Sequence, residues 1–139
     1  MVRSLSLSDN KIQLCKGIMA YNVHEAKFLW ETYGFKDIYV AYPCVQEQEL
    51  QVFCEVSAIE PGVLTATVDS EEHVVLLEHA YQNFFSGKDT KTTRPFLAVV
   101  IDMDMSYRPL GGLFHFGVQR SPCRTLEQFK KVHLFCCLC

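Results

Sequence analysis

The apolar run FLAVVIDM, residues 96–103, constrains the fold of this chain more than any other segment. It shows no alternation of apolar and polar residues, and it follows GKDTKTTRP, a polar segment with the composition of a surface loop. A short, uninterrupted apolar run of this kind is typical of a β-strand covered on both faces. The sequence therefore predicts a layered α/β protein in which residues 96–103 form a central strand.

Two helices are predicted by their start and stop signals. The first begins with Asn22 and Glu25, spaced as in a capping box, and stops at Gly34, which can adopt a left-handed conformation. The second, with the same pattern of signals, extends from Asp69 to Gly87. Their expected buried stripes are Ala26, Leu29, Trp30 and Tyr33 in the first helix, and Val74, Leu77, Tyr81 and Phe84 in the second.

Strands are expected in DIYVAYP, LQVFCEVSAI and VLTATV, and a last strand or hairpin in PLGGLFHFGV. In LQVFCEVSAI, residues 50–59, the alternation places Leu50, Cys54 and Ala58 on one face of a half-buried strand. The predicted fold is α/β, with a small mixed β-sheet flanked by two helices. We divide the chain into a polar arm at residues 1–16, an α/β domain at 17–118 and a cysteine-rich C-terminal tail at 119–139.

Composition narrows the class of protein. With 139 residues, 49% of them hydrophobic, the chain has the size of one domain with its own core. Its 13 basic and 16 acidic residues give a net charge of −3, which argues against a protein that coats nucleic acid unaided. No run approaches the ~20 apolar residues of a membrane span, so no membrane partner is expected.

The seven cysteines are odd in number, and the N-terminus lacks the apolar core of a signal peptide. We therefore expect free thiols in the cytosol or nucleus. Cys44 could act as a nucleophile with a histidine, but both Cys44 and Cys54 are better interpreted as core or interface residues. In the tail, His133 lies near Cys136, Cys137 and Cys139, which leaves two alternatives: a zinc site, or an apolar tail that packs on something or is disordered.

Other ionisable residues give weaker indications. His73 and His79 lie six apart on the second helix and point to different sides, so they do not form a metal pair. Asp102 and Asp104 have strand spacing, which would place both carboxylates on one face at the end of an apolar strand. Such a pair could bind a divalent ion, act as acid and base, or simply turn into solvent. We predict no metal and no cofactor.

Several segments together resemble the smallest, non-catalytic subunit of the eukaryotic tRNA-splicing endonuclease. They are the helix VHEAKFLWETYGF, the Cys44-Val45 pair, ELQVFCEVSAIE, the strand-to-helix unit LTATVDSEEHVVLLEHAYQNF and the late strand FLAVVIDMDMSY. The resemblance extends from Asn22 to Phe114. It departs from the family after Tyr107, where a paired-tyrosine segment is replaced by RPLGG, and the tail from Gln119 has no counterpart.

The resemblance implies a fold like the C-terminal domain of the tRNA-intron endonucleases, and a nuclear, non-catalytic role, with the cytoplasm as a second location. Such a subunit pairs with a catalytic subunit in a heterotetramer that removes introns from precursor tRNA. Catalytic relatives place a histidine on the strands between the two helices. This chain has no histidine from Glu25 to Glu72, so no catalytic residue is expected.

The resemblance also implies that an acidic loop of the structural subunit docks into a basic pocket of its partner. We nominate Asp102 and Asp104 for that loop, and an apolar set for strand-edge pairing with the catalytic subunit. Precursor tRNA would be met through the complex, and a homodimer is an alternative state of the isolated chain. A small metal-binding protein or an adaptor unrelated to tRNA is the competing hypothesis. The apolar set is Leu113, Phe114, Phe116 and Val118.

Overall fold

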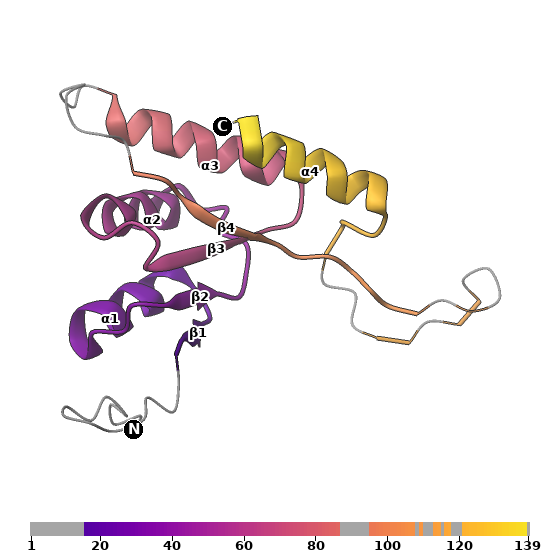
Figure 1. The fold of residues 1–139 in the computed structure, drawn as a ribbon, viewed down its shortest axis with the longest axis horizontal. Coiled ribbons are helices and arrows are strands. Elements are labelled where there is room, and N and C mark those ends of the chain that lie inside the picture. The colour runs from indigo at the N-terminus through magenta and orange to yellow at the C-terminus, as the bar shows by residue number, and fades with distance from the viewer. Residues whose placement is uncertain are drawn as a thin grey trace.

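The protein folds as a series of βα units, shown in Figure 1. This computed structural model describes residues 16–86, 95–107, 109, 113–114, 116–117 and 121–138. Of the predicted N-terminal arm, residues 1–16, the structure describes only Lys16. In chain order the elements are β1 (Ile18–Ala20), α1 (Val23–Tyr33), β2 (Ile38–Val40), α2 (Glu47–Ile59), β3 (Leu64–Val68), α3 (Glu71–Phe85), β4 (Ala98–Ile101) and α4 (Leu126–Leu138).

The four strands form one sheet in the order β1-β2-β3-β4, and all three strand pairs are parallel. The predicted α/β class is confirmed. The structure has four helices where the sequence indicated two flanking helices, and within the described residues the sheet itself has only parallel pairs. An isolated antiparallel bridge, Tyr107 with Phe116, lies outside the sheet.

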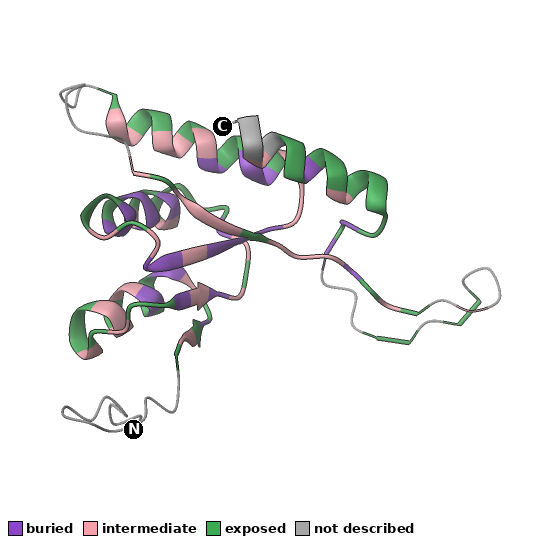
Figure 2. Ribbon diagram, viewed as in Figure 1, coloured by how far each residue is buried: buried purple, intermediate pink, exposed green. Residues whose placement is uncertain are grey.

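The core lies between the sheet and the helices. Ala20, Val40, Ala66 and Val99 occupy one register row across all four strands and face the helices. Each helix contacts the next in the chain, so α1, α2 and α3 form one layer. Figure 2 shows the buried residues gathered where the strands meet these helices. Parallel strands in sequential order have right-handed crossovers, which place the connecting helices on the same face.

The first predicted helix is confirmed as α1. The side chain of Asn22 accepts a hydrogen bond from the backbone N–H of Glu25 at 2.9 Å, and the carboxylate of Glu25 accepts one from the N–H of Tyr21 at 2.7 Å. Gly34 ends the helix with φ 71°, and its N–H donates to the carbonyl of Trp30. A left-handed residue at this point favours glycine, which has no Cβ to clash.

The second predicted helix is confirmed as α3. Its N-cap is Ser70, one residue after the predicted start, and the Ser70 hydroxyl accepts from the N–H of His73 at 3.4 Å. Val74 and Leu77 are buried as predicted, whereas Tyr81 and Phe84 are half-buried. The helix ends at Phe85, and the predicted stop at residue 87 lies outside the described residues.

The predicted strand at residues 50–59 is wrong, because this segment is part of helix α2. Its period-2 alternation coexists with a helical stripe: Leu50, Phe53, Cys54 and Ser57 recur at three- and four-residue spacing, and all four are buried. Glu60 then ties the end of α2 to α1 and its following loop by accepting hydrogen bonds from the Trp30 indole, at 2.9 Å, and from Lys36. These two donors lower the pKa of Glu60 below its usual value.

The strand predicted at residues 96–103 is confirmed as β4, Ala98–Ile101, but its predicted central position in the sheet is wrong. β4 occupies the edge of the sheet in the order of described strands, next to β3 alone. Val99 points into the core, but Val100 on the opposite face is 39% exposed and Phe96 is 66% exposed. The uninterrupted apolar run is explained by one covered face and one face that no described element covers.

That uncovered face continues across the sheet. Met19 and Tyr39 share a register row with Thr65 and Ala98, and Met19 is 66% exposed. Thr67, on the same face, is buried instead of exposed. Its hydroxyl donates a hydrogen bond to the carbonyl of Val40 at 2.5 Å. Parallel sheets are usually covered on both faces. Within the described part of the chain, one face of this parallel sheet is therefore open to a further layer.

The C-terminal tail contributes to the same core. Helix α4 packs against α3 and β4, and Val132 is buried among the core residues. Phe129 and His133 stack with their rings 6.1 Å apart. The described part of the tail therefore packs on the protein, which agrees with the apolar-tail alternative, whereas the side chains of Cys137 and Cys139 lie outside the described residues. No helix in the described ranges is long and apolar enough to cross a membrane.

Phe53→Ala should lower the free energy of unfolding by about 3–5 kcal/mol, because Phe53 is fully buried in α2 against the core and its truncation leaves a cavity. Urea denaturation measures the change. Phe28→Ala is the matched control: Phe28 is 53% exposed on α1, and its loss should cost about 1 kcal/mol or less. Equal losses for the two variants would contradict the placement of α2.

Candidate functional site

After β4 the chain leaves the sheet and projects away from it, as Figure 1 shows on the right of the view. We call the described residues from 102 to 117 the β4 extension. Tyr107 and Phe116 pair across it, each donating its backbone N–H to the carbonyl of the other at 2.9 Å. Gly117 adopts φ 120°, and a Cβ there would lie 3.2 Å from the Cβ of Ser106. The two sides of the extension therefore approach closely at this pair.

The base of the extension is fixed by hydrogen bonds to the segment that returns to α4. Asp102 donates its backbone N–H to Val68 of β3 at 2.8 Å, and its carbonyl accepts from the hydroxyl of Ser121 at 2.7 Å. The same hydroxyl accepts from the N–H of Cys123 at 3.1 Å. Because these partners join residue 102 to residues 121 and 123, the extension starts and ends at one point of the sheet edge.

Asp104 strengthens this junction with its side chain. Its backbone N–H donates to the carbonyl of Cys123 at 2.8 Å, and its carboxylate accepts from the N–H of Ser106 at 2.9 Å. The second carboxylate oxygen lies 3.4 Å from Nε of Arg124. The side chain of Asp104 has no exposed surface. Its carboxylate is therefore used inside the chain, and only Asp102 of the nominated acidic pair is partly exposed.

The outer part of the extension carries exposed apolar side chains. Leu113 is 82% exposed, Phe116 61% and Phe114 56%. Val118, the fourth apolar residue predicted to bind a partner, lies outside the described residues. Two residues that the sequence did not single out, Met105 and Tyr107, are exposed beside them. Contiguous exposed apolar side chains of this kind mark protein-interaction sites.

A second group of polar side chains lies where β2 and β3 end. His73 is buried on α3, and its Nε2 is 2.6 Å from the carbonyl oxygen of Cys44. A nitrogen facing a carbonyl oxygen must donate, so Nε2 carries the hydrogen. The other ring nitrogen faces a carboxylate oxygen of Asp69 at 3.6 Å. Since its Nε2 is committed to a backbone carbonyl, His73 is not placed to take a proton from the Cys44 thiol.

The buried thiols are poor nucleophiles for a physical reason. Burial, followed by the charge and hydrogen bond of Glu49, raises the pKa of Cys44 from 9.0 to about 12. Burial also raises the pKa of Cys123, with further contributions from the charges of Asp69 and Asp102. The thiolate is the reactive form of cysteine, so both residues stay unreactive near neutral pH. Cys44 and Cys54 are buried, which confirms their prediction as core residues.

Metal-binding groups are absent from the described residues: no three histidine, cysteine or acidic side chains there lie close enough to hold an ion. His73 is buried and His79 exposed, which agrees with their predicted separation. His133 and Cys136 lie on α4, while the side chains of Cys137 and Cys139 and the basic residues Lys88, Lys91 and Arg94 fall outside what the structure describes.

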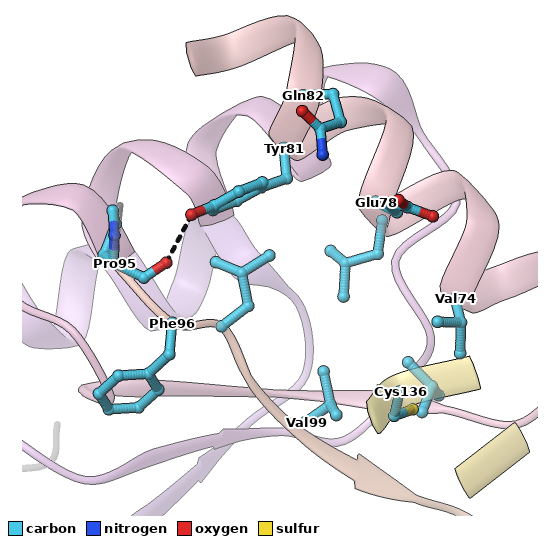
Figure 3. Close-up of a pocket in the computed structure, with 11 residues that line it drawn as sticks. Val74, Glu78, Tyr81, Gln82, Pro95, Phe96, Val99 and Cys136 are labelled. Carbon is cyan, nitrogen blue, oxygen red and sulfur yellow. Dashed lines mark hydrogen bonds between the residues drawn. The ribbon is translucent and has the colours of Figure 1, made fainter. Parts of the chain in front are cut away.

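A pocket of about 230 Å³ lies between α3, β4 and α4, and Figure 3 shows its lining. Val74 and Val99 form part of an apolar wall, and Cys136 enters from α4. The hydroxyl of Tyr81 donates to the carbonyl of Pro95 at 2.8 Å, which joins α3 to the segment before β4. Glu78, Tyr81 and Gln82 supply the polar part of the lining.

Sequence reasoning missed Arg124, Ser121 and Cys123 as the partners that hold the extension. The available signal was the position of Asp102 and Asp104 directly after a strand, where buried carboxylates need donors. What the sequence could not supply was the return of a segment some twenty positions later.

No protein-family model matches the chain, and comparison with curated proteins and with solved structures finds no match.

Asp104→Ala should destabilise the protein by about 1.5–3 kcal/mol, because it leaves the N–H of Ser106 and the guanidinium of Arg124 without their buried acceptor. It should also speed amide exchange at Tyr107 and Phe116, measured by hydrogen–deuterium exchange. Asp102→Ala is the control, since it retains the backbone N–H and carbonyl through which Asp102 joins the sheet. A larger effect of Asp102→Ala would refute the assigned role of Asp104.

Cys44 should resist alkylation by iodoacetamide at about pH 8 by at least a hundredfold relative to the urea-unfolded chain. The raised pKa also sets a pH window: the stability from the protonated thiol is complete below pH 9.0 and is lost as pH rises towards about 12. Peptide mapping by mass spectrometry follows the alkylation, with half-buried Cys136 as an internal reference. Alkylation of Cys44 at its unfolded rate in the folded protein would contradict this assignment.

Proposed function

We propose that this protein is a non-catalytic structural subunit of the tRNA-splicing endonuclease, which removes introns from precursor tRNA in the nucleus. In this role it pairs with a catalytic subunit inside the heterotetramer and meets precursor tRNA through the complex. The identity of the complex comes from the sequence resemblance over residues 22–114. The observation that carries the assembly role is the β4 extension with its exposed apolar residues.

The extension has the properties of a binding element. The extension exposes the apolar side chains of Leu113, Phe114 and Phe116. Exposed apolar surface of this kind does not contribute to the stability of an isolated protein. The base of the extension is fixed by Asp104 and its partners, so the cost of ordering it on binding is reduced. Aromatic side chains held in this way are the residue type that most often dominates binding energy at protein interfaces.

The uncovered sheet face provides a second contact area for the same partner. It begins at β4, the strand from which the extension leaves, and includes exposed Phe96 and Val100. A partner that pairs with the edge of β4 would cover these side chains while it contacts the extension. Edge pairing sets the geometry of the complex, and the aromatic residues supply the buried area.

The non-catalytic role is supported by the state of the ionisable residues. The pKa of Cys44 is raised, and His73 binds a backbone carbonyl. The sequence between Glu25 and Glu72 contains no histidine, whereas the resemblance implies one there in cleaving relatives. A general acid–base mechanism needs a proton carrier within reach of its substrate, and none of these residues is placed as one.

Two other functions were considered from the sequence. A metal-binding protein predicts a stoichiometric ion after purification without chelator, and an adaptor unrelated to tRNA predicts partners other than endonuclease subunits. Affinity purification of the tagged chain from cells, followed by identification of its partners and metal analysis, separates these functions from the proposed one. The proposal expects endonuclease subunits as partners, and it also expects no cleavage of precursor tRNA by the purified chain alone.

The double change Phe114→Ser and Phe116→Ser should weaken binding to the catalytic subunit by at least about tenfold, which corresponds to about 1.4 kcal/mol. Isothermal titration with the purified catalytic subunit measures it. Phe28→Ser is the matched control: Phe28 is a similarly exposed phenylalanine on α1, away from the extension, and its loss should leave the affinity within about twofold. Unchanged affinity of the double variant, or an equal loss for Phe28→Ser, would argue against the extension as the pairing element.

A further inference from the structure

The groove between α2 and α3 has features of a second binding surface, separate from the β4 extension. It has a volume of about 350 Å³ and opens to solvent where the two helices lie side by side. Leu50, Leu76 and Ala80 supply apolar surface, and Phe84 lies at one end. Val45 at the other end is 61% exposed, so the groove is not filled by the chain's own described residues.

The rim of the groove follows the helical repeat. Glu47, Gln51 and Glu55 lie four residues apart on α2, so they form one line along that side. His79 and Asn83 line the α3 side, with the amide nitrogen of Asn83 3.3 Å from Nδ1 of His79. From residue 47 to residue 55 this rim is about 12 Å long, at 1.5 Å per residue. The groove is therefore long enough for two turns of a partner helix.

Charge gives the groove its selectivity. Helices α2 and α3 carry six glutamates, at positions 47, 49, 55, 71, 72 and 78, and no lysine or arginine. The chain has 16 acidic and 13 basic residues, so everything outside these two helices has 10 acidic and 13 basic residues, a formal charge of +3. The two helices therefore carry a formal charge of −6, and Glu47 and Glu55 are the glutamates that line the groove itself. Of the glutamates on the rim, Glu55 is partly neutralised by Lys27 at 3.4 Å.

We propose that the α2/α3 groove is a docking site for a basic amphipathic helix of a partner protein. Leucine-like side chains at four-residue spacing on that helix would enter between Leu50 and Leu76, and its lysines or arginines would face Glu47 and Glu55. This is the helix-in-groove mode of recognition, in which apolar anchors supply affinity and the charged rim supplies orientation. An acidic helix of the same shape is rejected by like-charge repulsion.

The test uses a fluorescein-labelled amphipathic peptide of about 14 residues, or four helical turns. One face of the peptide carries leucines and the remaining positions carry lysines. Fluorescence anisotropy with the full-length protein should show saturable binding that weakens at least about tenfold between about 0.1 M and 1 M salt, where the Debye length falls from ~10 to ~3 Å. The same peptide with glutamate in place of lysine should not bind.

Leu76→Lys should weaken peptide binding at least about tenfold, because it places a cation at the mouth of the groove. Val75→Lys is the matched control, because it adds the same charge to the same helix at the preceding residue, which does not line the groove. It should change the affinity for the peptide less than about threefold. Val75 and Leu76 are 48% and 43% exposed, so both variants should fold, which circular dichroism checks.

A second pair of matched variants keeps the test decisive if Leu76→Lys does not fold. Gln51→Lys on the rim should weaken binding, whereas Gln48→Lys, an exposed position of α2 outside the groove lining, should not. Absence of peptide binding, equal effects of matched variants, or a self-associated dimer dissolved by Leu76→Lys would overturn the proposal. The Phe114→Ser and Phe116→Ser variant should keep full peptide affinity, so this site and the proposed endonuclease role fail or succeed separately.

Discussion

The fold depends on one register row of the sheet, in which Ala20, Val40, Ala66 and Val99 face the helices at the same level of four parallel strands. Small and β-branched side chains in this row allow α1, α2 and α3 to lie against the strands as one layer. The order β1-β2-β3-β4 with parallel pairing then requires every crossover to fall on that side. One consequence is a well-packed core on one face, and the other is an opposite face that no described element covers.

The exposed surfaces follow from this arrangement. Because β4 is the last strand in the described sheet, its outer edge pairs with no described strand, and its outward side chain Val100 is 39% exposed. The extension leaves the sheet from the same edge and returns through Ser121 to α4. The open edge of β4 and the extension therefore adjoin each other, so that a single partner can contact both.

The sequence predicted the elements whose signals are local. Asn22 with Glu25 and Gly34 defined α1 well, since capping and a left-handed stop act within a few residues. It failed for α2, because EQELQVFCEVSAI satisfies both period 2 and period 3.6, and burial of Phe53 in the common core favours the helix. For β4 it predicted the strand but not its place at the edge of the described sheet, because the apolar run has a covered face on one side and an exposed Val100 on the other.

The candidate site was predicted in part for the same reason. The exposed residues Leu113, Phe114 and Phe116 were recognisable from apolar residues beside glycines, whereas the role of Asp104 depends on Arg124, twenty positions later. The two proposed binding surfaces also differ in the physics that defines them. The extension is apolar and joined to the edge strand, while the α2/α3 groove combines an apolar floor with a rim that carries Glu47 and Glu55. The groove lies on the helical layer and the extension leaves the sheet edge at β4, so the two proposed surfaces belong to different elements of the fold.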